Sequence, residues 1–261
     1  AGSPADREVL LLTGWTDYAF SSDNVAAHQA GFSLTPPGLQ VRDEAGRWRT
    51  VDADLGVPVG RPQTLVVDLS RLPLRDRTVR IVTNMRVYWD QILVAAALPS
   101  PSLAVDPVPR LGAELRWRGF SAEVAPDGRE PFGYDYERVR REAPWKLPAG
   151  RYTREGDVSE LVDEADDRFV VSRSGDELAL SFDARALPPL PSGMRRTYLL
   201  HTIGYSKEMD FHSASPDRVA PLPFGAMSGY PYGLPERYPR EADLDRFHTR
   251  VVPRSIPLLA H

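Results

Sequence analysis

The chain contains no cysteine, and this absence excludes disulfide bridges and metal sites built from thiolates. Only two of its 32 basic residues are lysines, and the formal net charge is −4 at pH 7. Without a basic excess, a nucleic-acid partner is not expected. No stretch reaches the roughly 18 consecutive apolar residues of a membrane-spanning helix, so we expect no membrane span.

The sequence patterns of well-known enzyme classes are missing as well. There is no Gly-x-Ser-x-Gly nucleophile turn, no phosphate-binding loop and no His-Glu-x-x-His zinc pattern. The chain of 261 residues is long enough to bury roughly three quarters of its unfolded surface, so it needs no cross-links to fold. With 25 prolines and 19 glycines, many turns and long ordered loops are expected.

One strand–turn–strand pattern occurs twice and is the main sequence evidence for the fold. In each copy an alternating apolar strand is followed by a Leu-Pro stop and by a second strand that begins with arginine. The parts lie at 64–70, Leu72-Pro73 and 77–84 in the first copy, and at 177–183, Leu187-Pro188 and 195–202 in the second. Residues 7–14 resemble a second strand whose first strand is missing, so we expect the chain to be part of a larger parent protein.

Short strands separated by turn signals, with few helices, are typical of a β-sandwich or jelly roll. We therefore predict an all-β protein with jelly-roll or β-sandwich units, two in number, and long loops rich in proline and glycine. The predicted parts are a sandwich at 1–100, a surface connector at 101–150, a second sandwich-like unit at 151–225 and an ordered proline-rich tail at 226–261. Whether the two strand repeats form one core or two stays open.

Several short elements are predicted within these parts. Turn and capping signals favour helical turns, and alternation favours strands. The helical segments are predicted at 25–29, 137–142, 157–164 and 241–248, and two further strands at 168–173 and 197–203.

Aromatic and polar residues gather near residues 84–91, at the end of the first predicted sandwich. Jelly rolls bind sugars with such groups, because the C–H face of a sugar stacks on an aromatic ring while polar groups hold its hydroxyls. The candidate ligand-binding residues are Trp15, Asn84, Arg86, Tyr88, Trp89 and Asp90. In the structural alternative, Trp89 packs at the end of the sandwich and Asp90 stabilises a turn.

Asp17, Asp23 and Asn24 lie in one loop, and oxygen ligands crowded in a loop can hold calcium. They are the candidate metal ligands, and calcium is the one cofactor that the sequence suggests. Their spacing matches no defined calcium loop, and helix caps or Asx turns are the commoner use of such residues. The acidic run at 163–167 is interpreted as a solvated face.

The densest polar cluster lies between His201 and His212. A hydrolase-like acid–base site is one interpretation, because histidine titrates near neutral pH and lysine stabilises developing negative charge. The candidate catalytic residues are His201, Lys207, Asp210 and His212. In the other interpretation the cluster is a structural loop whose polar groups are satisfied locally.

Five phrases of the sequence resemble a known protein region and are spread over nearly the whole chain. They lie at 14–24, 80–91, 150–157, 174–183 and 221–224. Together they resemble the C-terminal region of large bacterial proteins with FG-GAP-type propeller repeats and an ASPIC/UnbV-type segment. The resemblance implies an accessory region of an extracytoplasmic protein (periplasmic, secreted or on the cell surface) and supplies no catalytic residues. Residues 1–96 also resemble a galactose-binding-like jelly roll, an analogy of fold only.

We therefore expect a non-enzymatic binding or assembly module that docks against the rest of its parent, another protein or a glycan. The alternatives are a hydrolase-like enzyme and a purely structural β-sandwich scaffold, in which a neighbouring segment completes the open edge of the first strand. A glycan binder should expose Trp15 or Trp89. An enzyme should bring His201 and His212 to a common pocket.

Overall fold

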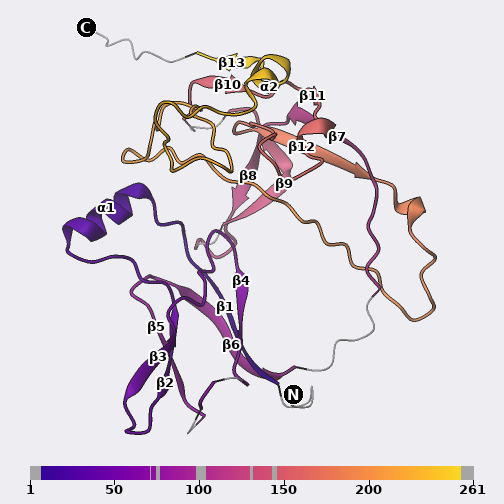
Figure 1. The fold of residues 1–261 in the computed structure, drawn as a ribbon. Helices are drawn as coiled ribbons and strands as arrows, with labels where there is room; N and C mark the ends of the chain where they lie inside the picture. Colours follow the sequence, from indigo (N-terminus) through magenta and orange to yellow (C-terminus); the bar gives the residue numbers. More distant parts are fainter. Residues whose placement is uncertain are drawn as a thin grey trace. The chain divides into compact units, whose positions relative to one another are not determined.

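The computed structural model describes residues 7–70, 72–74, 77–97, 104–129, 132–142 and 146–253. Within these ranges the chain consists mainly of strands in small sheets, with only two α-helices (Figure 1). The prediction of an all-β fold is confirmed. None of the helices in these ranges has the length and apolar character needed to cross a membrane. The chain divides into two compact units, residues 1–104 and 105–261.

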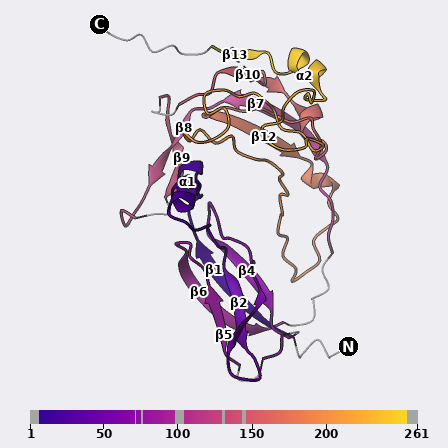
Figure 2. The ribbon, with the colours of Figure 1, turned by 60° about the vertical axis from the view of Figure 1, so that its left-hand side comes forward.

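The first sheet of the first unit has the strand order β4-β1-β6 and is antiparallel throughout (Figure 2). Its strands are β1 (Glu8–Trp15), β4 (Gln63–Asp68) and β6 (Tyr88–Ala96). Leu12 of β1 pairs with Leu65 on one side and with Ile92 on the other. The expectation of an open edge at the first strand is therefore wrong, because two later strands of the same chain return to cover both edges.

A second antiparallel sheet completes the first unit and has the order β3-β2-β5. Its strands are β2 (Gly38–Arg42), β3 (Trp48–Asp52) and β5 (Val79–Val82). β2 and β3 form a hairpin, and β5 pairs with the free side of β2. The two strands of the first repeat, β4 and β5, thus belong to different sheets.

In β1, every second side chain faces the core of the first unit. Leu10 and Leu12 lie on the same face of that strand and pack in one buried cluster with Leu39 and Leu69. The burial of each leucine side chain stabilises the folded state by roughly 1.5–3 kcal/mol. The helix α1 (Ser21–Gln29) contains the predicted helical segment 25–29.

The second unit is built around a three-stranded sheet of order β11-β7-β12. Its strands are β7 (Arg110–Trp117), β11 (Gly156–Asp157) and β12 (Asp176–Phe182). The central strand β7 belongs to the stretch that was predicted as a surface connector. Ala113 and Leu115 of β7 form the buried core with Val158, Leu161 and Phe247.

Two smaller sheets and three helical segments complete this unit. β8 pairs with β9, and β10 pairs with β13. The bounds are β8 (Phe120–Val124), β9 (Gly133–Arg140), β10 (Gly150–Tyr152), β13 (Arg250–Val252), the 3₁₀ helices η2 (Ser159–Leu161) and η3 (Ala184–Ala186), and α2 (Glu241–Arg246).

The local predictions have mixed outcomes in the second unit. The helix expected at 241–248 is confirmed as α2, and the one expected at 157–164 is a single 3₁₀ turn, η2. The helical turn predicted at 137–142 is wrong, because residues 137–140 belong to β9, where Val139 and Arg140 pair with β8. The strands predicted at 168–173 and 197–203 are also wrong, since neither segment pairs with a described strand.

His248 lies fully buried in the second unit. Burial lowers the pKa of His248 below its ordinary value of 6.5, and the backbone of Phe169 and the carboxylate of Asp243 offset only part of this effect. The folded state therefore binds the proton less readily than the unfolded state. The stability that depends on neutral His248 is present above pH 6.5 and is lost as the pH falls below this value.

We expect the free energy of unfolding to decline as the pH is lowered from about 7 to about 5, and to decline less in His248→Leu. Urea titrations at several pH values measure both slopes. His28→Leu removes an exposed histidine and is the matched control. Equal slopes for wild type and His248→Leu would contradict the expectation.

Candidate functional site

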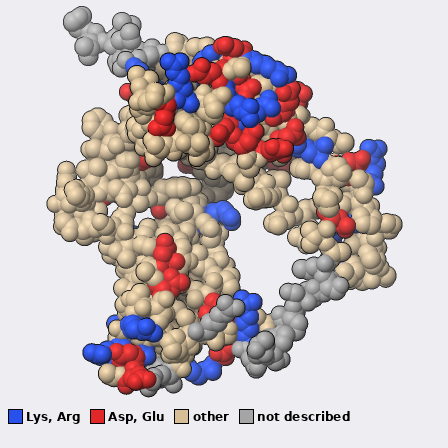
Figure 3. All heavy atoms as spheres, viewed as in Figure 1, with Lys and Arg blue, Asp and Glu red and all other residues tan. Residues whose placement is uncertain are grey.

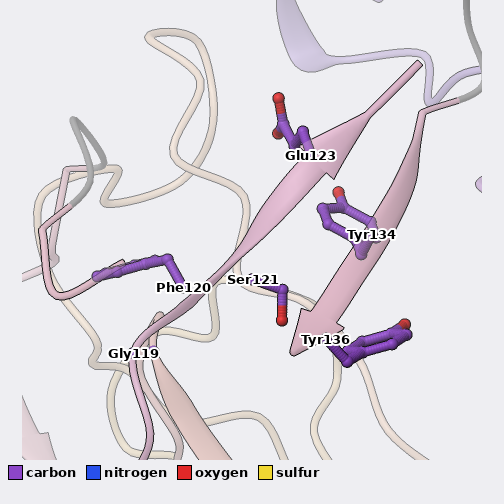
Figure 4. A pocket seen from close by; sticks show the side chains of 7 residues that line it. Gly119, Phe120, Ser121, Glu123, Tyr134 and Tyr136 are labelled. Atoms are coloured by element: carbon purple, nitrogen blue, oxygen red, sulfur yellow. The ribbon is translucent and has the colours of Figure 1, made fainter. Parts of the chain in front are cut away.

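A shallow, open hollow of about 400 Å³ lies on the β8–β9 hairpin (Figure 4). Its aromatic and polar side chains come from both strands, and two glycines form part of its lining. The lining residues are Gly119, Phe120, Ser121, Glu123, Tyr134, Tyr136 and Gly175.

The period of two in the hairpin determines which side chains meet in the hollow. Tyr134 and Tyr136 are two positions apart on β9 and therefore share a face, and Glu123 of β8 is the register partner of Tyr134. The two tyrosine rings lie with their centroids 6.5 Å apart at an angle of 41°. Both rings are accessible, Tyr134 to 52% and Tyr136 to 68%. The strand pairing thus produces an exposed aromatic surface with a carboxylate beside it.

Gly119, at one end of the hollow, allows the chain to enter β8 at close range. Its φ of +106° lies in the region that favours glycine, and a Cβ there would stand 2.6 Å from the carbonyl oxygen of Arg140. No side chain fits at this position without displacing the neighbouring backbone. The glycine therefore allows the start of β8 to lie close to the end of β9.

Of the two charged side chains at the hollow, Arg118 has partners and Glu123 has none in the described part of the chain. Arg118 is fixed by the carboxylate of Glu177 at 2.9 Å, and its Nη1 donates to the hydroxyl of Ser121 at 3.0 Å. Glu123 is exposed and forms no hydrogen bond or ion pair with any residue that the structure describes. The hollow therefore offers a carboxylate without a described partner, while the nearby guanidinium of Arg118 is bound to Glu177, which Arg116 also contacts.

The two tryptophans predicted to bind a ligand contribute mainly to the first unit's own packing, whereas Tyr88 is exposed. Trp15 is buried, at 8% exposed, and its ring lies 5.5 Å from that of Tyr88. Trp89 is half-buried and packs against the core of the unit. A glycan site at the end of the first unit requires an exposed tryptophan, and neither Trp15 nor Trp89 is exposed.

The polar members of the same predicted site are all exposed, and one of them, Asn84, also connects two loops by hydrogen bonds. The side chain of Asn84 accepts from the N–H of Thr35 at 2.7 Å and donates to the carbonyl of Ser33 at 2.9 Å. Arg86 and Asp90 are exposed. Asn84 therefore ties two loops together.

The predicted calcium ligands form local hydrogen bonds of turns and helix ends. Asp17 accepts from the N–H of Tyr18 at 2.8 Å, and Asp23 accepts from the N–H of Phe20 at 3.0 Å. Asn24 donates to the carbonyls of Ala19 and Phe20. Within the described ranges, no group of three or more His, Cys, Asp or Glu side chains is arranged to hold a metal ion.

The candidate catalytic residues are only partly brought together. His212 Nδ1 lies 3.9 Å from Asp210 Oδ1, while Lys207 Nζ lies 3.1 Å from the hydroxyl of Tyr230. His201 is exposed and forms no hydrogen bond with the other three candidates. None of the four lines the hollow on β8–β9.

A second hollow, of about 320 Å³, lies among charged side chains of the second unit. It includes part of the predicted acidic face at 163–167. Three of its four carboxylates are paired with arginines: Arg168 lies 3.2 Å from Glu160, Arg240 lies 3.9 Å from Asp166, and Arg110 pairs with Asp163. Figure 3 shows acidic and basic side chains interspersed on this unit. These ion pairs indicate a structural charge network.

Sequence reasoning missed the hollow on β8–β9. The phrase Phe132-Gly-Tyr-Asp-Tyr136 contains its signal, since Tyr134 and Tyr136 alternate with Asp135 as side chains on one face of a strand do. No family model, no curated protein and no solved structure matches this chain.

Proposed function

We propose that this protein is a non-enzymatic binding module and that the hollow on β8–β9 binds a neutral carbohydrate. The observation that carries the proposal is the pair of exposed tyrosine rings beside the unpaired carboxylate of Glu123. The apolar C–H face of a sugar ring stacks on an aromatic ring, and a carboxylate accepts hydrogen bonds from sugar hydroxyls.

The charge distribution favours neutral over acidic sugars. Glu123 repels an acidic sugar, and Arg118 cannot compensate because Glu177 already binds it. An open hollow also admits an internal residue of a longer chain as readily as a chain end. With aromatic contacts of about 0.5–1.5 kcal/mol each, we expect dissociation constants on the order of a millimolar per site.

The proposal fits the resemblance to C-terminal regions of FG-GAP and ASPIC/UnbV-type proteins, which implies an extracytoplasmic location in a larger parent. A weak carbohydrate site there gains affinity when several copies or domains bind the same polymer. Docking against the parent or another protein is the other part of the expected role.

Titration with neutral oligosaccharides, followed by calorimetry or NMR, tests this function. We expect Tyr136→Ala and Tyr134→Ala each to weaken binding about fivefold, because each removes a stacking surface worth about 1 kcal/mol. Glu123→Gln should weaken it about fivefold to tenfold, since a charged acceptor becomes a neutral one.

Tyr88→Ala is the matched control, because Tyr88 has nearly the same exposure, 53%, on the other unit. It should leave the affinity unchanged. If no neutral oligosaccharide binds to the wild type, or if Tyr88→Ala abolishes binding while Tyr136→Ala does not, the proposed site is wrong.

A further inference from the structure

Residues 188–206 form the longest exposed stretch of the described chain. Every residue in this range is exposed, and Leu199 reaches 94%. Residues 195–206 belong to no helix or strand, and none of their backbone groups forms a hydrogen bond with a described residue. Figure 1 draws the stretch as an orange trace that follows β12 and η3. Its backbone is therefore already open, whereas a paired strand must first unfold locally to become accessible.

Two consecutive arginines, Arg195 and Arg196, lie inside this stretch. Arg195 is exposed and forms no hydrogen bond or ion pair with any residue that the structure describes. The guanidinium of Arg196 donates to the carbonyl of Pro188 at 2.6 Å, within the same exposed stretch. No other described arginine lies in a run of exposed residues as long as this one. The pair therefore combines two accessible cationic side chains with an open backbone.

An arginine-specific endopeptidase recognises this combination. Such an enzyme selects arginine through a carboxylate in its specificity pocket. It also needs an exposed and locally unfolded backbone, which is why proteases cut native proteins in open loops. Arg195 and Arg196 meet both requirements. Arg80 meets only the first, because its side chain is exposed while its backbone lies in β5 and pairs with Gln40 of β2.

The parts of the second unit on either side of this pair are held together by contacts that a cut does not touch. Phe247, from the C-terminal part, packs in the buried core with Leu115 of β7. β13 pairs with β10 across the same division. Arg250 binds the fully buried carboxylate of Asp176. A single cut after Arg195 or Arg196 therefore leaves two products joined by core packing, a strand pair and a buried ion pair.

We propose that Arg195-Arg196 is a processing site, at which an arginine-specific endopeptidase cuts the folded protein into two parts that stay associated. One water molecule hydrolyses the peptide bond after one of the two arginines. The reaction forms a carboxylate on that arginine and an amino group on the residue that follows. The hollow on β8–β9 lies entirely in the N-terminal part, so its strand pairing is kept. The inference does not require that the hollow bind a carbohydrate.

Limited digestion of the full chain with trypsin, followed by mass spectrometry, tests the site. The first cut should follow Arg195 or Arg196 and should be at least roughly a hundredfold faster than the cut after Arg80. Arg195→Gln with Arg196→Gln should lose this cut, whereas Arg195→Lys with Arg196→Lys should keep it, because trypsin also accepts lysine. Arg80→Gln is the matched control and should be cut like the wild type. First products of the wild type that end at any other residue would overturn the proposal.

Size-exclusion chromatography of the cut protein tests whether the two parts stay associated. They should elute together at the volume of the intact chain, and the amides of β7 and β12 should keep their slow hydrogen exchange. The cut form of Arg250→Ala should separate at a lower urea concentration than the cut wild type, because it lacks the buried ion pair with Asp176. Separate elution of the two parts of the wild type without urea would overturn the association.

Discussion

Replacing Leu115 with alanine is expected to lower the free energy of unfolding of the second unit by about 2–5 kcal/mol. Leu115 is fully buried at the centre of β7, and its side chain packs in the core cluster with Val158, Leu161 and Phe247. Truncation removes apolar contacts and leaves a cavity that neighbours on several elements cannot all fill. Urea denaturation, followed by amide exchange in β7 and β12, measures the loss.

Leu111→Ala is the control for this expectation. Leu111 lies on the same strand but is 64% exposed, so its truncation should change stability by less than about 0.5 kcal/mol. Equal losses in the two variants would show that the burial of Leu115 is not the cause of its effect on stability.

Replacing Arg250 with alanine is expected to destabilise the second unit by about 3–5 kcal/mol. The side chain of Asp176 is fully buried, and Arg250 binds both of its carboxylate oxygens, with Nη1 3.0 Å from Oδ1. Removal of the guanidinium leaves the buried carboxylate with two contacts to Arg173, whose N–H donates to it at 2.9 Å and whose Nε lies 3.6 Å from Oδ1. The cost arises because a charge outside water must keep its partners.

Two further variants separate this effect from a general loss of charge. Arg116→Ala breaks the ion pair with Glu177, the residue next to Asp176, but this pair is exposed and its loss should have little effect. The double variant Arg250→Ala with Asp176→Asn should recover part of the stability, because no full charge is then buried alone. If Arg116→Ala costs as much as Arg250→Ala in urea titrations, burial of Asp176 is not the cause.

The sequence was sufficient to predict the strands whose side chains alternate. β4 and β12 follow from the alternation in the repeated pattern, and the all-β class follows from several such stretches. The segment 137–142 shows where this reasoning fails, because its charged residues suit a helix when considered alone. Pairing with β8 outweighs that preference, and such pairing depends on residues far away in the chain.

The candidate site could not be predicted from local pattern because its members come from two strands in a particular register. Tyr134 and Glu123 become neighbours only through the pairing of β8 with β9. Trp15 and Trp89 are residue types that often bind sugars. In the structure, however, Trp15 packs against Tyr88, and Trp89 packs against the core. A sequence shows which residues are suited to binding, whereas burial decides which of them are accessible.

The central position of β1 in its sheet affects how the first unit folds during synthesis. Among the strands of this unit, β1 is synthesised first, yet its partners β4 and β6 are synthesised much later, and Leu11 can pair with Leu93 only when most of the unit exists. Such distant pairing requires the closure of long loops, which slows folding. During synthesis the apolar residues of β1 must therefore remain unpaired for longer than those of any other strand of the unit, and a chaperone that shields them would raise the yield of folded protein.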